Sequence, residues 1–173
     1  MNVARIRLIT DRTDDLTPAQ LEVYDKVAAS RGSMIRPFEV LAHVPGLAGP
    51  LSEVGAGIRY AGGLSDHDRE LTILTAAVVH GCDFEWQSHR AIALEAGVRP
   101  EALEHLRGGA AELTPDEALV VGFVKELCAT STLSEATFTA AADHLGEAGV
   151  VELATVVGYY TLLAFVMGAV DAC

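Results

Sequence analysis

Four side chains between residues 70 and 89 are candidates for acid/base or nucleophilic catalysis: Glu70, Cys82, Glu85 and His89. Glu85 and His89 are four residues apart, a spacing that places both on one face of a helix, close enough to hydrogen-bond or to share a water. An ordinary surface pair of this kind contributes only roughly 0.3 kcal/mol, and spacing alone favours that interpretation.

The apolar surroundings of Glu70 favour a catalytic role for this stretch over an ordinary surface pair. Its neighbours Leu71, Ile73 and Leu74 are apolar, so we expect this carboxylate to be partly buried. Desolvation and a nearby imidazolium act in opposite directions on a carboxyl group, and enzymes use this competition to keep an acid and a base at one pH. The stretch is therefore a candidate acid/base site.

Cys82 comes just before the expected start of a helix, where the helix dipole can stabilise a thiolate. A small buried apolar residue is the favoured interpretation, because position 85, three residues further on, carries Glu85 instead of a second cysteine. Cys128 and Cys173 are too distant in sequence to serve as obvious resolving thiols. An odd number of widely spaced cysteines predicts reduced thiols.

A metal site is a second possibility for this stretch. His80, Glu85 and His89 are side chains that suit zinc, copper or iron, but no HExxH run or comparable motif is present, so the sequence predicts no metal. Further along, Tyr159 and Tyr160 are expected to be core or interface aromatics rather than catalytic phenols.

Composition narrows the classes of partner. The chain has 173 residues, 50% of them hydrophobic, and a formal net charge of -12. This predicts one domain with a sizeable core and disfavours nucleic acid or an anionic membrane as a partner, which leaves a small molecule.

The first residues lack the apolar run of a secretory signal, so a cytoplasmic location is expected. The apolar stretch 150–170 is interpreted as a buried helix rather than a membrane span.

Helix start and stop signals recur along the chain. Thr17 and Thr114 each precede a proline and stand three residues before Gln or Glu, which predicts capped helix starts. Gly32, Gly97 and Gly146 stand where helical patterns end. No segment alternates as a strand, so we expect an all-α bundle. The expected helices are 17–31, 38–43, 47–61, 66–80, 83–96, 100–107, 115–129, 134–145 and 149–169.

The pattern as a whole resembles the carboxymuconolactone decarboxylase and AhpD-like family. The similarity covers most of the chain and is carried by Arg69-Glu70-Leu71, Cys82, Glu85-Trp86, His89, Ala96-Gly97-Val98 and stretches within 151–160. It implies a single domain over 1–173, with a helical N-terminal extension of about 1–60 and a core of about 61–173. It also implies an AhpD-like helical bundle that forms homotrimers or homohexamers.

In AhpD-like peroxidases a glutamate is followed twelve residues later by the first cysteine of a CxxC motif, and a histidine lies four residues after the second. Glu70, Cys82 and His89 match these positions, but Glu85 replaces the second cysteine, so peroxidase activity does not carry over. The decarboxylase branch implies loss of carbon dioxide from a lactone acid without a cofactor. His89 would donate the proton, Glu85 would orient it, and Glu70 would polarise or position the substrate.

Two further residues are predicted to contribute to substrate binding, Trp86 and Arg36, the latter by holding a carboxylate. Three hypotheses therefore stand: a metal-free acid/base lyase, a redox protein using the single thiol of Cys82, and an oligomeric binding module without catalysis. Substitution of His89 should abolish the first activity and substitution of Cys82 the second, whereas neither should matter for the third.

Overall fold

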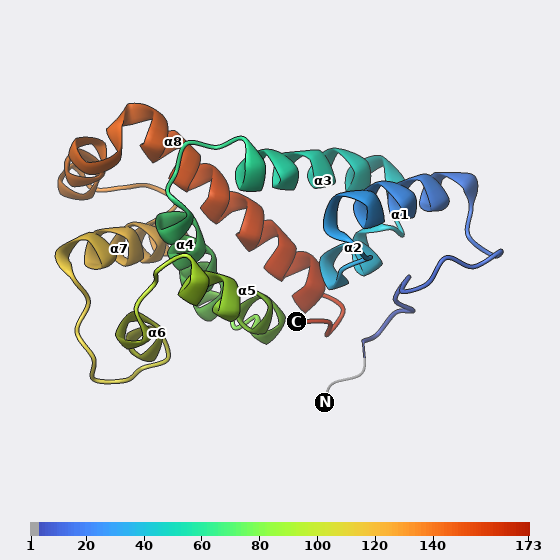
Figure 1. Ribbon diagram of the computed structural model, residues 1–173, viewed down its shortest axis with the longest axis horizontal. Coiled ribbons are helices and arrows are strands. Elements are labelled where there is room, and N and C mark those ends of the chain that lie inside the picture. The colour runs from blue at the N-terminus through green and yellow to red at the C-terminus, as the bar shows by residue number, and fades with distance from the viewer. Residues whose placement is uncertain (1–3) are drawn as a thin grey trace. The chain divides into compact units, whose positions relative to one another are not determined.

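The computed structural model describes residues 4–173, and every regular element within that range is a helix, which confirms the all-α prediction. The chain forms two compact units, one of residues up to Gly62 together with Phe165–Cys173, the other Gly63–Ala164. Residues Phe165–Cys173 thus group with the N-terminal segment rather than with Gly63–Ala164. The helices are α1 (Pro18–Arg31), α2 (Arg36–Leu41), α3 (Pro45–Tyr60), α4 (Asp66–Val79), α5 (Asp83–Glu95), α6 (Pro100–Leu106), α7 (Pro115–Thr130) and α8 (Glu135–Gly168) (Figure 1).

The helix starts follow the local signals in the sequence. The Thr17 and Thr114 side chains accept hydrogen bonds from the backbone N–H of Gln20 and Glu117, whose own side chains accept from the threonine N–H in return. Each arrangement is a complete capping box, which satisfies two of the N–H groups that a helix start leaves unpaired. At the other end of α1, Gly32 has φ 81°, the left-handed conformation expected for a terminating glycine.

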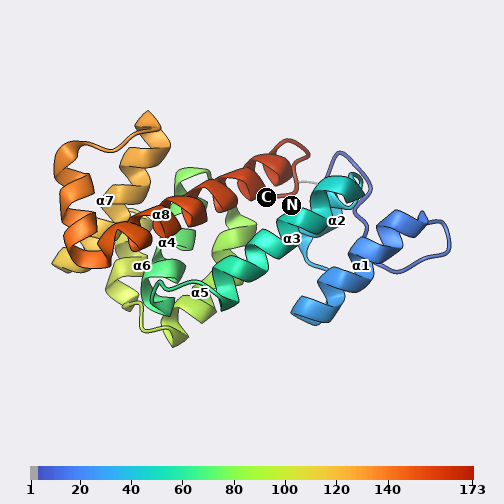
Figure 2. The same cartoon turned by 90° about the horizontal axis from the view of Figure 1, so that it is seen from above.

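The first unit is built from α1, α2 and α3, with both α1 and α2 packing on α3 (Figure 2). Its core includes the fully buried Val27 and Phe38. Arg31, at the end of α1, places its guanidinium 4.9 Å from the Phe38 ring centroid and donates a 3.0 Å hydrogen bond to the Ser52 hydroxyl of α3. A cation over an aromatic face and a hydrogen bond to the next helix together fix the C-terminal end of α1.

The second unit is organised around α4, which packs against α5, α6 and α7 (Figure 1). Leu71, Ile73 and Leu74 of α4 have no exposed surface, and Phe123 of α7 is equally buried. Because α4 is covered on several sides, its polar residues Asp68, Glu70, Thr72 and Thr75 are buried as well. Any titratable side chain in the middle of α4 therefore lies in the interior of this unit.

The long C-terminal helix α8 is interrupted at Gly146, whose φ 73° and ψ 168° are not helical. The break lies where the sequence analysis expected one helix to end and another to begin. By length and composition α8 could span a membrane. Half of its most apolar stretch is buried inside the protein, as in the central helix of a core, so this resemblance to a membrane helix is weak evidence.

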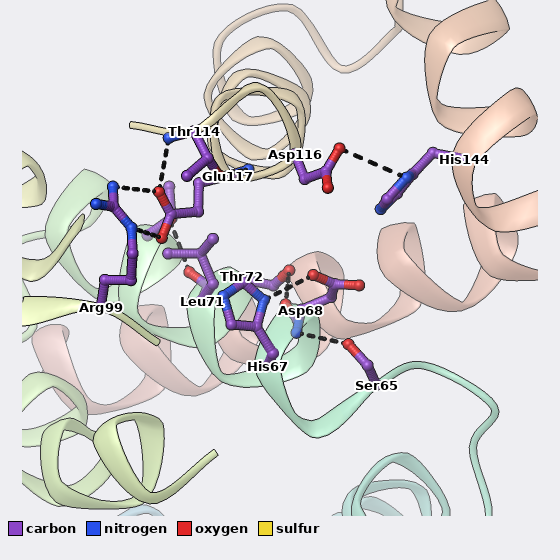
Figure 3. A network of polar contacts seen from close by, with 11 residues as sticks. Ser65, His67, Asp68, Leu71, Thr72, Arg99, Thr114, Asp116, Glu117 and His144 are labelled. Atoms are coloured by element: carbon purple, nitrogen blue, oxygen red, sulfur yellow. Dashed lines mark hydrogen bonds and ion pairs between the residues drawn. The ribbon is translucent and has the colours of Figure 1, made fainter. Parts of the chain in front are cut away.

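A polar network fixes α6 and α7 within the second unit (Figure 3). Arg99, the residue before α6, donates to both oxygens of the buried Glu117 carboxylate at 3.0 and 2.8 Å, while the Thr114 N–H donates to the same carboxylate at 2.8 Å. Hydrogen bonding to Arg99 is the main cause that holds the pKa of Glu117 below its ordinary value. Nearby, Asp116 and His144 approach to 3.8 Å and connect α7 with α8.

Candidate acid/base site

Glu70 of α4 and His89 of α5 face each other in the interior of the second unit. The chain reverses at Gly81, whose φ of 64° is readily reached only by glycine, so α5 packs back against α4. Glu70 Oε2 lies 2.7 Å from His89 Nδ1. Both residues are buried, with 1% and 5% of their surface exposed. When Glu70 is ionised its oxygen can only accept, and Nδ1 is then the donor of this bond.

The other imidazole nitrogen, Nε2, faces two further polar groups. Glu85 Oε2 lies 3.6 Å away and the Tyr160 hydroxyl of α8 lies 3.5 Å away. The Tyr160 and His89 rings are perpendicular, with centroids 5.3 Å apart. The sequence analysis treated Tyr160 as a packing residue, because nothing in its local pattern distinguishes it from its buried neighbour Tyr159.

Arg69 of α4 partly balances the negative charge of the two carboxylates in this cluster. Arg69 Nε lies 3.5 Å from Glu70 Oε1, on the side of the carboxylate away from His89, and a second nitrogen of Arg69 contacts Asp66 at 2.8 Å. Two carboxylates and one imidazole thus share a desolvated space, with one guanidinium at its margin. Such a site can hold a proton on the imidazole and pass it to a substrate, because low exposure strengthens each electrostatic interaction.

The relative positions of the two glutamates differ from the roles that the sequence suggested. The family resemblance implied that Glu85 orients His89, yet Glu70 makes the short contact and Glu85 the long one. The distance of 3.6 Å exceeds that of a normal hydrogen bond. The geometry therefore favours Glu70 as the group that fixes the imidazole.

The cysteines do not match the expectation of three reduced thiols. Cys82 is buried at the N-cap of α5, as its position before the helix predicted, but neither it nor Cys173 is a free thiol in the structure. Cys128 of α7 is the free cysteine among the described residues. Its half-buried position raises the pKa of the Cys128 thiol, which leaves less thiolate at neutral pH.

His80 belongs to a different group of side chains from His89. Its Nε2 lies 2.9 Å from the Thr161 hydroxyl and 3.7 Å from Cys128 Sγ. Burial lowers the pKa of His80, because desolvation disfavours the charged imidazolium. Within residues 4–173, no three His, Cys, Asp or Glu side chains are arranged so that they could hold a metal ion.

The two residues predicted to bind substrate lie in separate units. Trp86 is on α5, next in sequence to Glu85, and is buried beneath the Arg107 guanidinium, which lies 4.9 Å from its ring centroid. Arg36 begins α2 in the first unit, where its Nε lies 3.0 Å from Glu39 Oε2. Substrate binding by either residue stays a prediction.

Comparisons with known proteins agree with this description of the fold. Residues 45–126, which include Glu70, Cys82, Glu85 and His89, match the model of the carboxymuconolactone decarboxylase family. No curated protein sequence matches the chain. Among solved structures the chain is similar to the alkylhydroperoxidase AhpD core of an uncharacterized peroxidase-related protein from Ralstonia eutropha JMP134. That match has a TM-score of 0.80 and 17% identity and covers 100% of this chain and 93% of the other. At this identity the likeness shows the fold alone.

Proposed function

From the match of residues 45–126 to the carboxymuconolactone decarboxylase family model, we propose that the chain is a member of this family and a cofactor-independent acid/base lyase acting on a small lactone or carboxylic acid. The observation that carries the proposal is the buried 2.7 Å contact between Glu70 and His89. A carboxylate that fixes one imidazole nitrogen leaves the other nitrogen for proton transfer.

In the proposed reaction the bond between the substrate and its carboxyl carbon breaks, and the electron pair moves into a conjugated carbonyl. The carbon that lost carbon dioxide is then protonated by His89. Because Glu70 holds the Nδ1 proton, the transferred proton comes from Nε2, so the donating form is the imidazolium. The Glu70 carboxylate stabilises that cation, while Glu85 and Tyr160 lie beside Nε2 at 3.6 and 3.5 Å.

The thiol alternative has less support from the side chains. A peroxidase cycle needs a reactive thiolate and a resolving partner. Cys82 is not a free thiol, and burial raises the pKa of the free Cys128 thiol. A binding module without catalysis would not need an imidazole whose two nitrogens both face polar side chains, an arrangement that favours the lyase.

The test is a set of pH-rate profiles against lactone acids and β-keto acids, for the wild type, His89→Ala and His144→Ala. His144 is an exposed histidine of the same unit and serves as the matched control. We expect turnover of one acid class that is lost in His89→Ala and kept in His144→Ala. Consumption of tert-butyl hydroperoxide with a modified cysteine, and no turnover of any acid, would replace the lyase by the thiol activity. Equal ligand binding by all three proteins without any turnover would favour the binding module.

We further propose that the protein acts in the cytoplasm as a homotrimer or homohexamer. In the second unit Val151 and Phe138, both on α8, are 67% and 44% exposed. A neighbouring subunit would cover exposed apolar side chains of this kind in an oligomer. Light scattering coupled to size-exclusion chromatography would distinguish a trimer and a hexamer from a monomer.

A further inference from the structure

A groove of about 640 Å³ lies beside α5 and α6 in the second unit. One wall is a row of α5 side chains spaced by four residues, Trp86, Arg90 and Leu94, which share one face of that helix. Leu103 of α6 and Arg107, the residue that caps α6, contribute to the other wall. The groove thus combines an apolar surface with two guanidinium groups.

The two arginines are available to a ligand. Arg90 is exposed and has no ion-pair partner among the described residues, although the chain as a whole carries a net charge of -12. Arg107 is half-exposed, and its pair with the exposed Asp83 has a separation of 3.3 Å. Exposed ion pairs contribute little to stability, so Arg107 can exchange this partner for another anion at small cost.

The other groups of the groove define the ligand more closely. Arginine binds carboxylates through paired hydrogen bonds, and Leu94 is 39% exposed beside Arg90, a surface that suits a hydrocarbon body. Glu104 also lines the groove, and its carboxylate would repel a ligand that is negatively charged along its whole length. A volume of about 640 Å³ is in the range of small-molecule sites. We propose that the groove binds a small organic carboxylate, with its charged end on Arg90 and Arg107 and its apolar part against Leu94 and Leu103.

This site is distinct from the acid/base cluster. On an ideal helix the row of Trp86, Arg90 and Leu94 is rotated by about 120° from the row of Glu85 and His89. His89 does not line the groove. The inference therefore does not rest on the proposed lyase activity, and the groove should bind its ligand equally well in His89→Ala.

The chain contains a natural reporter for this site. Trp86 is its single tryptophan, and Arg107 lies over its ring. An anion that draws Arg107 away from the ring changes the surroundings of the indole. Titration of the full-length protein with hexanoate, followed by tryptophan emission at constant ionic strength, should give a saturable change that chloride does not produce.

Arg90→Gln and Arg107→Gln should each weaken hexanoate binding by about tenfold or more, because each removes a charged hydrogen-bond donor. Arg59→Gln, which removes one positive charge in the first unit, is the matched control and should bind as the wild type does. An unchanged Kd in Arg90→Gln, or a response that follows ionic strength alone, would overturn the proposal. A saturable response to inorganic phosphate and none to hexanoate would also overturn it, because the groove would then select a phosphate.

Discussion

Replacement of Glu70 by methionine tests which carboxylate fixes His89. Methionine has a similar length, but its thioether sulfur is only a weak hydrogen-bond acceptor. The substitution therefore removes the 2.7 Å contact between two groups that are 1% and 5% exposed. A hydrogen bond to a charged group contributes about 1.5–3 kcal/mol. A double-mutant cycle of Glu70→Met and His89→Met should therefore give a coupling free energy in that range, since a cycle isolates the pairwise part.

The matched cycle uses Glu85→Met and His89→Met. Its coupling free energy should be below about 1 kcal/mol, because the 3.6 Å separation is too long for a normal hydrogen bond. The assay is urea unfolding of all variants at pH 7, with Glu95→Met, an exposed position at the end of α5, as a control whose unfolding free energy should change by less than about 0.5 kcal/mol. A larger coupling for Glu85 than for Glu70 would refute the assignment.

Nitrogen chemical shifts of the His89 ring give an independent measurement. In the wild type the Nδ1 atom should be protonated, because its partner is a carboxylate oxygen. In Glu70→Met that partner is absent, so the protonation of the two ring nitrogens should change. An identical pattern in both proteins would mean that Glu70 does not control the tautomer of His89.

Three further substitutions have defined outcomes. Glu117→Ala removes two hydrogen bonds from Arg99 and one from the α7 cap, which should lower the unfolding free energy by about 2–4 kcal/mol at pH 7. Arg99 lowers the folded-state pKa of Glu117, so this stabilisation is complete above the ordinary glutamate pKa of about 4.3 and is lost as the pH falls through the folded-state pKa. The urea midpoints of the wild type and Glu117→Ala should therefore converge in acid. A difference between them that stays constant with pH would contradict this. Tyr160→Phe removes a 3.5 Å contact with His89 and should lower kcat by roughly fivefold, at an unchanged KM, in the turnover assay; an unchanged kcat would leave the phenol a packing group. Gly146→Ala should lower the unfolding free energy measured in urea by about 1–3 kcal/mol, because φ 73° with ψ 168° is almost exclusive to glycine. An unchanged unfolding free energy would show that α8 can straighten at this position.

The helices were predictable because the signals that start and stop them are local. Thr17 and Thr114 act through backbone groups three residues away, so their capping boxes could be predicted without any knowledge of the fold. The same holds for Gly32 and Gly146, whose positive φ values end helical segments. Ser131, which ends α7 with φ 61°, was not predicted, because serine rarely adopts that conformation and carries no such signal.

The site was only partly predictable, since its decisive contact joins two helices. The spacing of Glu85 and His89 is a local property of α5, and their separation of 3.6 Å follows from it. The contact of Glu70 with His89 depends on how α4 packs against α5, and that of Tyr160 depends on the path of α8. Neither residue carries a sequence signal that identifies its partner. The sequence could therefore propose Glu70, Glu85 and His89 as candidates but could not show that Glu70 makes the shorter contact with His89.

The composition of α4 gives a separate reason to regard Glu70 as functional. Leu71, Ile73 and Leu74 of this helix have no exposed surface, so Glu70 lies among apolar neighbours along the chain. Desolvation of a carboxylate and an imidazole costs several kcal/mol, and their attraction often only balances this cost. A buried ionisable pair is thus no better for folding than apolar packing would be. Its presence in the largely buried helix α4 supports the proposed role in proton transfer, which requires groups that can carry charge.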